Sequence, residues 1–159
     1  MSKKIADILQ NRLNKLEKNY LALKEYNTLI EKLSLDIDIF TPSNFEKLLP
    51  EQKAILDAYL KRFSSVQDFL GAKVFALLLD IAGISYSKMS EVLYHIEKEG
   101  IIDSFEEWIE LREARNELEH DYPDELEDAL EDLRFCVESF DRLERYYINS
   151  INFAKRYLK

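Results

Sequence analysis

Hydrophobic positions recur at helical spacing along most of this chain. From Lys3 to Leu33, apolar residues are separated by threes and fours, which predicts one apolar face on a long helix. This stripe consists of Ile5, Ile8, Leu9, Leu13, Leu16, Tyr20, Leu23, Tyr26, Ile30 and Leu33. A broader stripe runs from Pro50, which suits the first turn of a helix, to Gly83. Its breadth predicts a second long helix at the centre of the fold.

Shorter helices are predicted on both sides of this central helix. Ser43 and Glu46 have the spacing of a capping box, which predicts a short helix before Pro50. A third main helix is expected from about Ser87 to Lys98, where Gly100 stops it.

The C-terminal third predicts two further helices. Ser104 and Glu107 repeat the capping-box spacing and open the fourth helix. Pro123 forces a break, because proline disfavours helical geometry at the preceding residue and lacks an amide hydrogen. A fifth helix is expected from there to about Leu158. The pattern predicts an all-α, antiparallel bundle of about five helices, with residues 1–159 as a single domain.

Composition agrees with a soluble helical protein. Hydrophobic residues make up 47% of the chain and charged residues 33%, and only three glycines and three prolines are present for turns. The N-terminal residues lack the apolar core of a signal peptide, and the most apolar run, Val74 to Ile84, is too short to span a bilayer. The single cysteine, Cys136, is expected to be a thiol in the core of a cytoplasmic protein.

Charge is unevenly distributed in this acidic chain, whose formal net charge is −9. Acidic residues crowd the run from Asp124 to Asp132, for which two interpretations stay open: a solvated helix face, or a docking face for a basic partner. Basic residues gather elsewhere, at Lys3, Lys4, Arg12, Lys15, Lys18, Lys61, Arg62, Lys73, Arg142, Arg145, Lys155, Arg156 and Lys159. A local positive cleft is therefore compatible with the acidic total.

Candidate chemistry is concentrated in R-N-E-L-E-H-D-Y, from Arg115 to Tyr122. An arginine that never deprotonates, beside a histidine that titrates near neutrality, suits phosphodiester chemistry. The alternative is structural, because Arg115 and Glu119 are four residues apart and can pair across a helix surface. The other histidine, His95, is interpreted as structural or surface-exposed. Trp108 and Phe105 are interpreted as core residues.

The run W-I-E-L-R-E-A-R-N-E-L-E-H-D-Y-P-D-E resembles the HEPN superfamily, specifically the HepT-like toxins with their R-x(4)-H-x-Y motif. Upstream, Y-L-K-R-F-S-S-V-Q-D-F-L-G-A-K-V-F looks like the long second helix of these proteins, and the resemblance extends from about Leu49 to the C-terminus. It implies an endoribonuclease toxin that cleaves RNA without a metal and leaves a 2′,3′-cyclic phosphate.

The resemblance also implies roles for individual residues. His120 would act as general base or acid, and Arg115 would stabilise charge on the phosphorane oxygens. Asn116 would orient His120 or bind the phosphate, or else serve only as a polar residue at a helix end. Tyr122 would be adenylylated by an MNT-type nucleotidyltransferase antitoxin, or else serve as an aromatic plug at a helix junction. No cofactor is implied, and the residue spacing suggests no metal site.

Helical geometry sets a condition on the catalytic pair. At about 100° per residue, Arg115 and His120 point about 140° apart on a regular helix. Either the helix unwinds before Pro123 and swings His120 round, or two chains combine their motifs in a homodimer, as HEPN proteins commonly do. The broad stripe of the second helix and the motif helix are expected to supply the dimer interface. The alternative function is a non-catalytic helical module that binds a nucleotidyltransferase.

Overall fold

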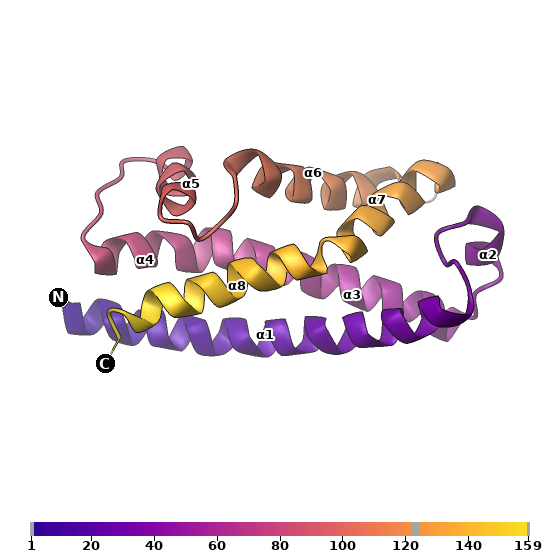
Figure 1. Ribbon diagram of the computed structural model, residues 1–159, viewed down its shortest axis with the longest axis horizontal. Helices are drawn as coiled ribbons and strands as arrows, with labels where there is room; N and C mark the ends of the chain where they lie inside the picture. Colours follow the sequence, from indigo (N-terminus) through magenta and orange to yellow (C-terminus); the bar gives the residue numbers. More distant parts are fainter. Residues whose placement is uncertain (1, 122–124, 159) are drawn as a thin grey trace.

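The computed structural model describes residues 2–121 and 125–158, and at residues 2 and 119–121 it describes the backbone alone. Every regular element in the described residues is helical, as the sequence pattern predicts. The elements are α1 (Ser2–Asp36), α2 (Pro42–Glu46), α3 (Pro50–Phe69), the π-helical turn η1 (Leu70–Val74), α4 (Phe75–Ala82), α5 (Met89–Lys98), α6 (Phe105–Asp121), α7 (Leu126–Glu138) and α8 (Phe140–Lys155). Figure 1 shows an elongated bundle with both chain ends at one end of the molecule.

The predicted second helix is present, but a π-turn interrupts it. α3, η1 and α4 follow one another without a break, and the Phe75 amide donates to the Leu70 carbonyl five residues back. The Arg12 side chain of α1 satisfies another carbonyl of this turn, since its Nη1 donates to Lys73 O at 2.8 Å. The helix ends at Gly83, whose φ of 74° lies in the left-handed region that glycine tolerates.

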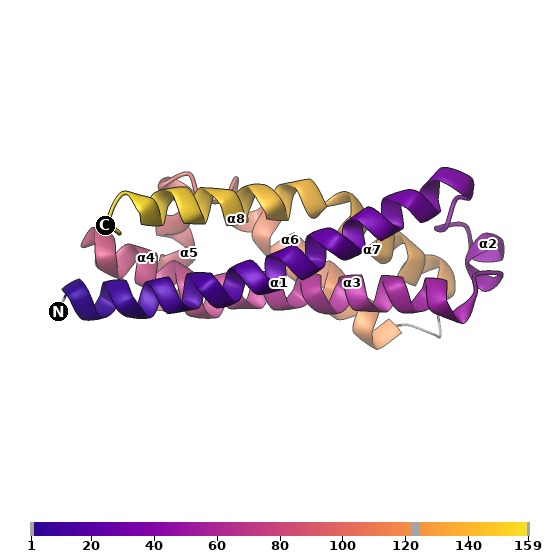
Figure 2. The same ribbon diagram turned by 90° about the horizontal axis from the view of Figure 1, so that it is seen from below.

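α1 lies beside α3 and runs in the opposite direction, and α8 covers the pair from another side (Figures 1 and 2). Tyr20 of α1 stacks on Tyr147 of α8, with ring centroids 4.0 Å apart. Tyr59 of α3 donates to the Cys136 carbonyl of α7 at 2.8 Å. Cys136 is buried, as the sequence predicts, and these contacts join α1, α3, α7 and α8 around one core.

Three details differ from the sequence expectations. The expected fifth helix is divided at Ser139, a buried residue between α7 and α8, so it does not run unbroken to Leu158. Ser43 does not cap the short helix, because α2 begins two residues earlier than a Ser43 cap requires and Thr41 takes the N-cap position. The apolar stripe of α3, expected at a dimer interface, is buried within the chain at Leu56, Tyr59, Phe63 and Val66.

Of the capping box predicted at the start of α6, the hydrogen bond to the Ser104 hydroxyl is present. The Ser104 hydroxyl accepts from the Glu107 amide at 3.0 Å. On the other side, Glu97 of α5 accepts from the Phe105 amide at 2.6 Å. These contacts set the start of α6, the helix that carries the candidate catalytic residues. Among the described residues, no helix is both long and apolar enough to cross a membrane.

Candidate functional site

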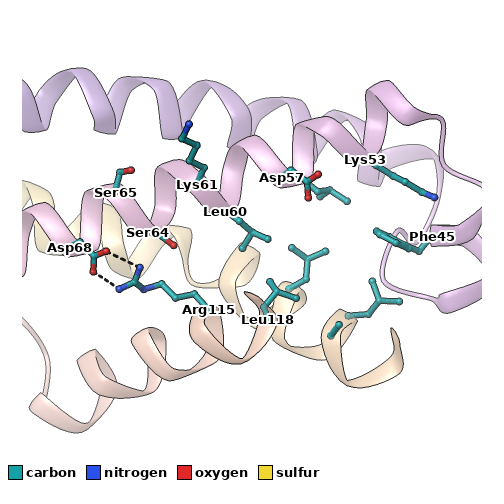
Figure 3. A pocket seen from close by; sticks show the side chains of 14 residues that line it. Phe45, Lys53, Asp57, Leu60, Lys61, Ser64, Ser65, Asp68, Arg115 and Leu118 are labelled. Atoms are coloured by element: carbon teal, nitrogen blue, oxygen red, sulfur yellow. Dashed lines mark hydrogen bonds and ion pairs between the residues drawn. The ribbon is translucent and has the colours of Figure 1, made fainter. Parts of the chain in front are cut away.

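A cavity of about 450 Å³ lies between α3, α6 and α7, with α2 at one end. Its lining residues are Phe45, Lys53, Leu56, Asp57, Leu60, Lys61, Ser64, Ser65, Asp68, Arg115, Leu118, Ala129, Leu130 and Leu133. Figure 3 shows Arg115 at one end and Phe45 with Lys53 at the other. The cavity therefore contains Arg115, the first residue of the motif.

Arg115 is held in place by Asp68 of α3. Its Nη1 donates to Asp68 Oδ2 at 3.2 Å, and its Nη2 donates to Asp68 Oδ1 (Figure 3). The arginine side chain is 6% exposed, whereas the aspartate side chain is 61% exposed. A buried guanidinium thus meets a carboxylate that solvent and ligands can reach, and two parallel hydrogen bonds fix its plane.

One nitrogen of the Arg115 guanidinium can still donate a hydrogen bond. Its Nε is buried and has no hydrogen-bond partner among the described residues. The charge of Arg115 also acts on the Cys136 thiol. Burial raises the pKa of this thiol to about 12; the negative charge of Asp132 adds to the increase, and the positive charge of Arg115 opposes it. Arg115 is thus a nearly fully buried cation whose charge acts on the neighbouring Cys136 thiol.

Other polar side chains border the cavity from α3. Figure 3 shows Ser64 and Leu60 pointing toward α6, while Lys61 and Ser65 point to the other side of α3. Lys53 lies over the Phe45 ring, with Nζ 5.3 Å from the ring centroid.

The charges of the cavity lining are balanced, although the whole chain is acidic. Lys53 and Arg115 contribute positive charge, Asp57 and Asp68 contribute negative charge, and the Lys61 side chain points to the other side of α3 (Figure 3). In contrast, the chain as a whole has a formal net charge of −9. An anionic group is therefore better accommodated here than on the average surface of the protein.

The motif residues do not all share the cavity. Arg115 is buried on the inner face of α6, whereas Asn116 is exposed. His120 lies on the described backbone of α6, but its side chain is outside the described residues, as is all of Tyr122. On a regular helix the position of His120 is about 40° from Asn116 and about 140° from Arg115. The helix therefore places positions 116 and 120 on one face and Arg115 on another.

The first of the two expected arrangements is not observed. α6 stays α-helical to Asp121, so its backbone is not unwound at position 120. Within one chain, the helix does not bring the two positions onto the same face. The combination of two chains stays a prediction.

Asp68, the partner of Arg115, was not identified from the sequence. The available signal was Gln67, a polar residue four after Phe63 and three before Leu70, which interrupts the apolar stripe of α3. Gln67 is buried, and its Nε2 donates to the Trp108 carbonyl of α6 at 2.9 Å. A polar residue at a core position indicates that the neighbouring helix offers it a partner, which places α3 against the motif helix.

The two aromatic residues at the start of α6 and the acidic run differ in how far they are buried. Trp108 is buried, as predicted, but Phe105 is exposed and is not a core residue, because it begins α6 at the surface. Within the acidic run, Glu125, Glu127, Asp128 and Glu131 are exposed, which agrees with a solvated face.

Metal ligands do not gather in the described part of the chain. There, no group of three or more histidine, cysteine, aspartate or glutamate side chains is arranged to hold a metal ion. The charged chemistry of the cavity is that of the arginine, the lysines and the two aspartates.

No protein-family model, curated protein or solved structure matches this chain. The functional interpretation therefore depends on the motif and on the cavity that contains Arg115.

Proposed function

We propose that this protein is a metal-independent endoribonuclease, the toxin of a HEPN/MNT toxin–antitoxin system in the cytoplasm. The observation that carries the proposal is the buried Arg115 guanidinium, fixed by Asp68 at the end of a cavity of about 450 Å³. A buried ion pair is weak evidence for stability, because desolvation offsets most of its attraction. A fixed cation is, however, what stabilises charge that develops on a phosphate during cleavage.

The proposed reaction uses the ribose of the substrate as nucleophile. The 2′-oxygen forms a bond to phosphorus and the bond from phosphorus to the 5′-oxygen breaks. One His120 side chain accepts the proton of the 2′-hydroxyl, and a protonated His120 gives a proton to the leaving 5′-oxygen. The products are a 2′,3′-cyclic phosphate and a 5′-hydroxyl end. Arg115 stabilises the phosphorane oxygens, and Asn116 orients His120 or binds the phosphate.

Two chains are needed for this site. Arg115 and His120 are about 140° apart on one α6 helix, so a homodimer must bring Arg115 of one chain near His120 of another. The exposed face that includes Asn116, toward the end of α6, is the proposed meeting surface. Light scattering at micromolar concentration should give the mass of a dimer, and a monomer would contradict the shared site.

The proposed antitoxin is an MNT-type nucleotidyltransferase that adenylylates Tyr122. Two residues after His120, a bulky and negatively charged nucleotide would repel RNA phosphates. Incubation with the partner and ATP should increase the intact mass in AMP steps while RNA cleavage falls. Tyr122→Phe should stay active and unmodified, and a mass increase in this variant would exclude Tyr122 as the acceptor.

A specific observation favours the alternative of a non-catalytic module that binds a nucleotidyltransferase. Much of the cavity lining is apolar, with Leu56, Leu60, Leu118, Leu130 and Leu133, which suits a side chain of a protein partner. This alternative predicts partner binding and no cleavage by the purified chain.

The deciding experiment measures RNA cleavage by purified variants without the partner. Wild type should cleave in the presence of EDTA, and His120→Ala should be inactive, because it removes the proton-transfer group. Arg115→Lys keeps a cation but loses the bidentate geometry, so it should lose most activity. Arg134→Lys, at an exposed arginine that pairs with Glu138, is the matched control and should cleave like wild type. Equal cleavage by all four proteins would contradict the assigned residues.

A further inference from the structure

A second cavity of about 240 Å³ lies against the π-turn. Its lining residues are Gln67, Asp68, Gly71, Ala72, Met89, Leu93, Trp108 and Arg112. Asp68 also lines the first cavity, where it holds Arg115, so the two cavities meet at one side chain. Single π-turns inside α-helices occur frequently at functional sites, because the extra residue displaces side chains from the regular helical pattern.

Gln67, which lines the second cavity, has a buried side-chain oxygen that accepts no hydrogen bond from the described residues. Gln67 is 1% exposed, and its Nε2 donates to the Trp108 carbonyl at 2.9 Å. This bond fixes the amide, yet Oε1 is buried without a hydrogen-bond partner in the part of the chain that the structure describes. A buried acceptor left unsatisfied is costly, so the geometry favours a ligand that donates a hydrogen bond to this oxygen.

Trp108 and small or flexible apolar residues form most of the walls of the cavity. At Gly71 a Cβ atom would lie 3.2 Å from Cζ2 of Trp108, so the missing side chain lets the π-turn approach the indole closely. Ala72 adds only a methyl group, and Met89 supplies a flexible thioether that adapts to aromatic rings. Arg112 is the cation of the lining, and it is exposed.

We propose that this cavity binds one nucleobase of the RNA substrate, next to the phosphate that is cleaved. The base donates an N–H to Gln67 Oε1, and Arg112 contacts the phosphate attached to that nucleotide. Recognition of an unstacked base by a hydrogen bond to its edge is the usual way in which proteins read single-stranded RNA. This inference rests on the proposed ribonuclease function and makes Gln67 a specificity-determining residue of it.

The chain offers a direct probe of occupancy, because Trp108 is its single tryptophan and lines this cavity. The experiment titrates the protein with AMP, CMP, GMP and UMP and records tryptophan fluorescence, with ribose 5-phosphate as the ligand without a base. At least one nucleotide should change the fluorescence at concentrations where ribose 5-phosphate does not. Gln67→Met should raise the dissociation constant of that nucleotide by about tenfold, because the hydrogen-bond acceptor is lost.

A second variant keeps the test valid if Gln67→Met folds poorly. Ala72 is exposed, so Ala72→Leu fills the cavity from its edge without disturbing the core, and it should abolish the fluorescence change. Ala54→Leu, an exposed position on α3 outside both cavities, is the matched control and should bind like wild type.

The outcomes separate this inference from the proposed function. Nucleotides that act no more strongly than ribose 5-phosphate, or normal binding by Ala72→Leu, would overturn the base site. RNA cleavage without base binding would overturn the base site alone. Base binding without RNA cleavage would overturn the ribonuclease function and the role of Gln67 in its specificity, and would leave only a nucleotide-binding cavity.

Discussion

Asp68→Ala tests whether Arg115 depends on its carboxylate partner. The substitution removes both acceptors from a guanidinium whose side chain is 6% exposed. Exposed ion pairs contribute about 0–1 kcal/mol, and breaking a fully buried pair costs about 3–5 kcal/mol. Because Arg115 is buried while Asp68 is 61% exposed, water can reach the site after truncation. We therefore expect an intermediate loss of about 1–3 kcal/mol in the free energy of unfolding.

Urea unfolding followed by circular dichroism measures this loss. With an m-value of about 2 kcal/mol/M, a loss of 2 kcal/mol moves the midpoint by about 1 M. Glu138→Ala is the matched control, because the Arg134–Glu138 pair is exposed at both ends, by 59% and 63%. The control should lose much less stability, because solvent screens an ion pair that is exposed at both ends.

The comparison between these two variants can refute the reasoning. If Asp68→Ala loses no more stability than Glu138→Ala at an unchanged m-value, Arg115 does not depend on Asp68 in solution. A double-mutant cycle of Asp68→Ala and Arg115→Met measures the coupling energy between the two residues. The reasoning predicts a favourable coupling, and a coupling of zero would refute it.

A buried thiol, two tyrosines with raised pKa values and the Arg12 donor to the π-turn can each be tested. Cys136, with its pKa raised to about 12 by burial, should resist a thiol reagent at pH 8 in the folded protein and react fully in denaturant; rapid native labelling would contradict its burial. Burial raises the pKa of Tyr146 to about 12 and that of Tyr20 still further, so the folded protein keeps protons that the unfolded chain loses above pH 10. The stability that these tyrosines contribute is therefore complete below pH 10. The part from Tyr146 is lost as the pH rises through 12 and the part from Tyr20 at still higher pH, and Tyr146→Phe should flatten the first decline in urea midpoints. Arg12→Ala removes the donor to the Lys73 carbonyl and should cost about 0.5–1.5 kcal/mol, and an unchanged midpoint would show that this bond does not support the π-turn.

Helix positions were largely predictable because their signals are local. The periodic stripe predicted a first helix from Lys3 to Leu33, and α1 spans Ser2–Asp36. Pro50 and Gly83 marked the ends of the central helix, since each residue type favours its position for reasons of backbone geometry. The division at Ser139 was not predictable, because this residue neither blocks nor favours a helix strongly and its burial depends on packing.

The candidate site was predictable only in part. Arg115 was identified from its motif, yet the partner that fixes it, Asp68, is 47 residues away on another helix. The π-turn contains Gly71, but a single glycine inside a helix does not specify π-helical geometry, and the contact of Arg12 with the Lys73 carbonyl comes from a distant part of the chain. Both cavities are lined by residues that are far apart in the sequence, so neither could be recognised from a local pattern.

The sequence by itself determined the helical character of the chain and where most of its helices begin and end. These properties depend on hydrophobic spacing and on residues that cap or break a helix within a few positions. Only the tertiary structure decided that Arg115 is buried against Asp68, that Asn116 faces outward, and that Gln67 lines a second cavity. The reason is physical: which face of a helix meets which neighbour depends on how several apolar faces are buried together, and no local pattern contains that information.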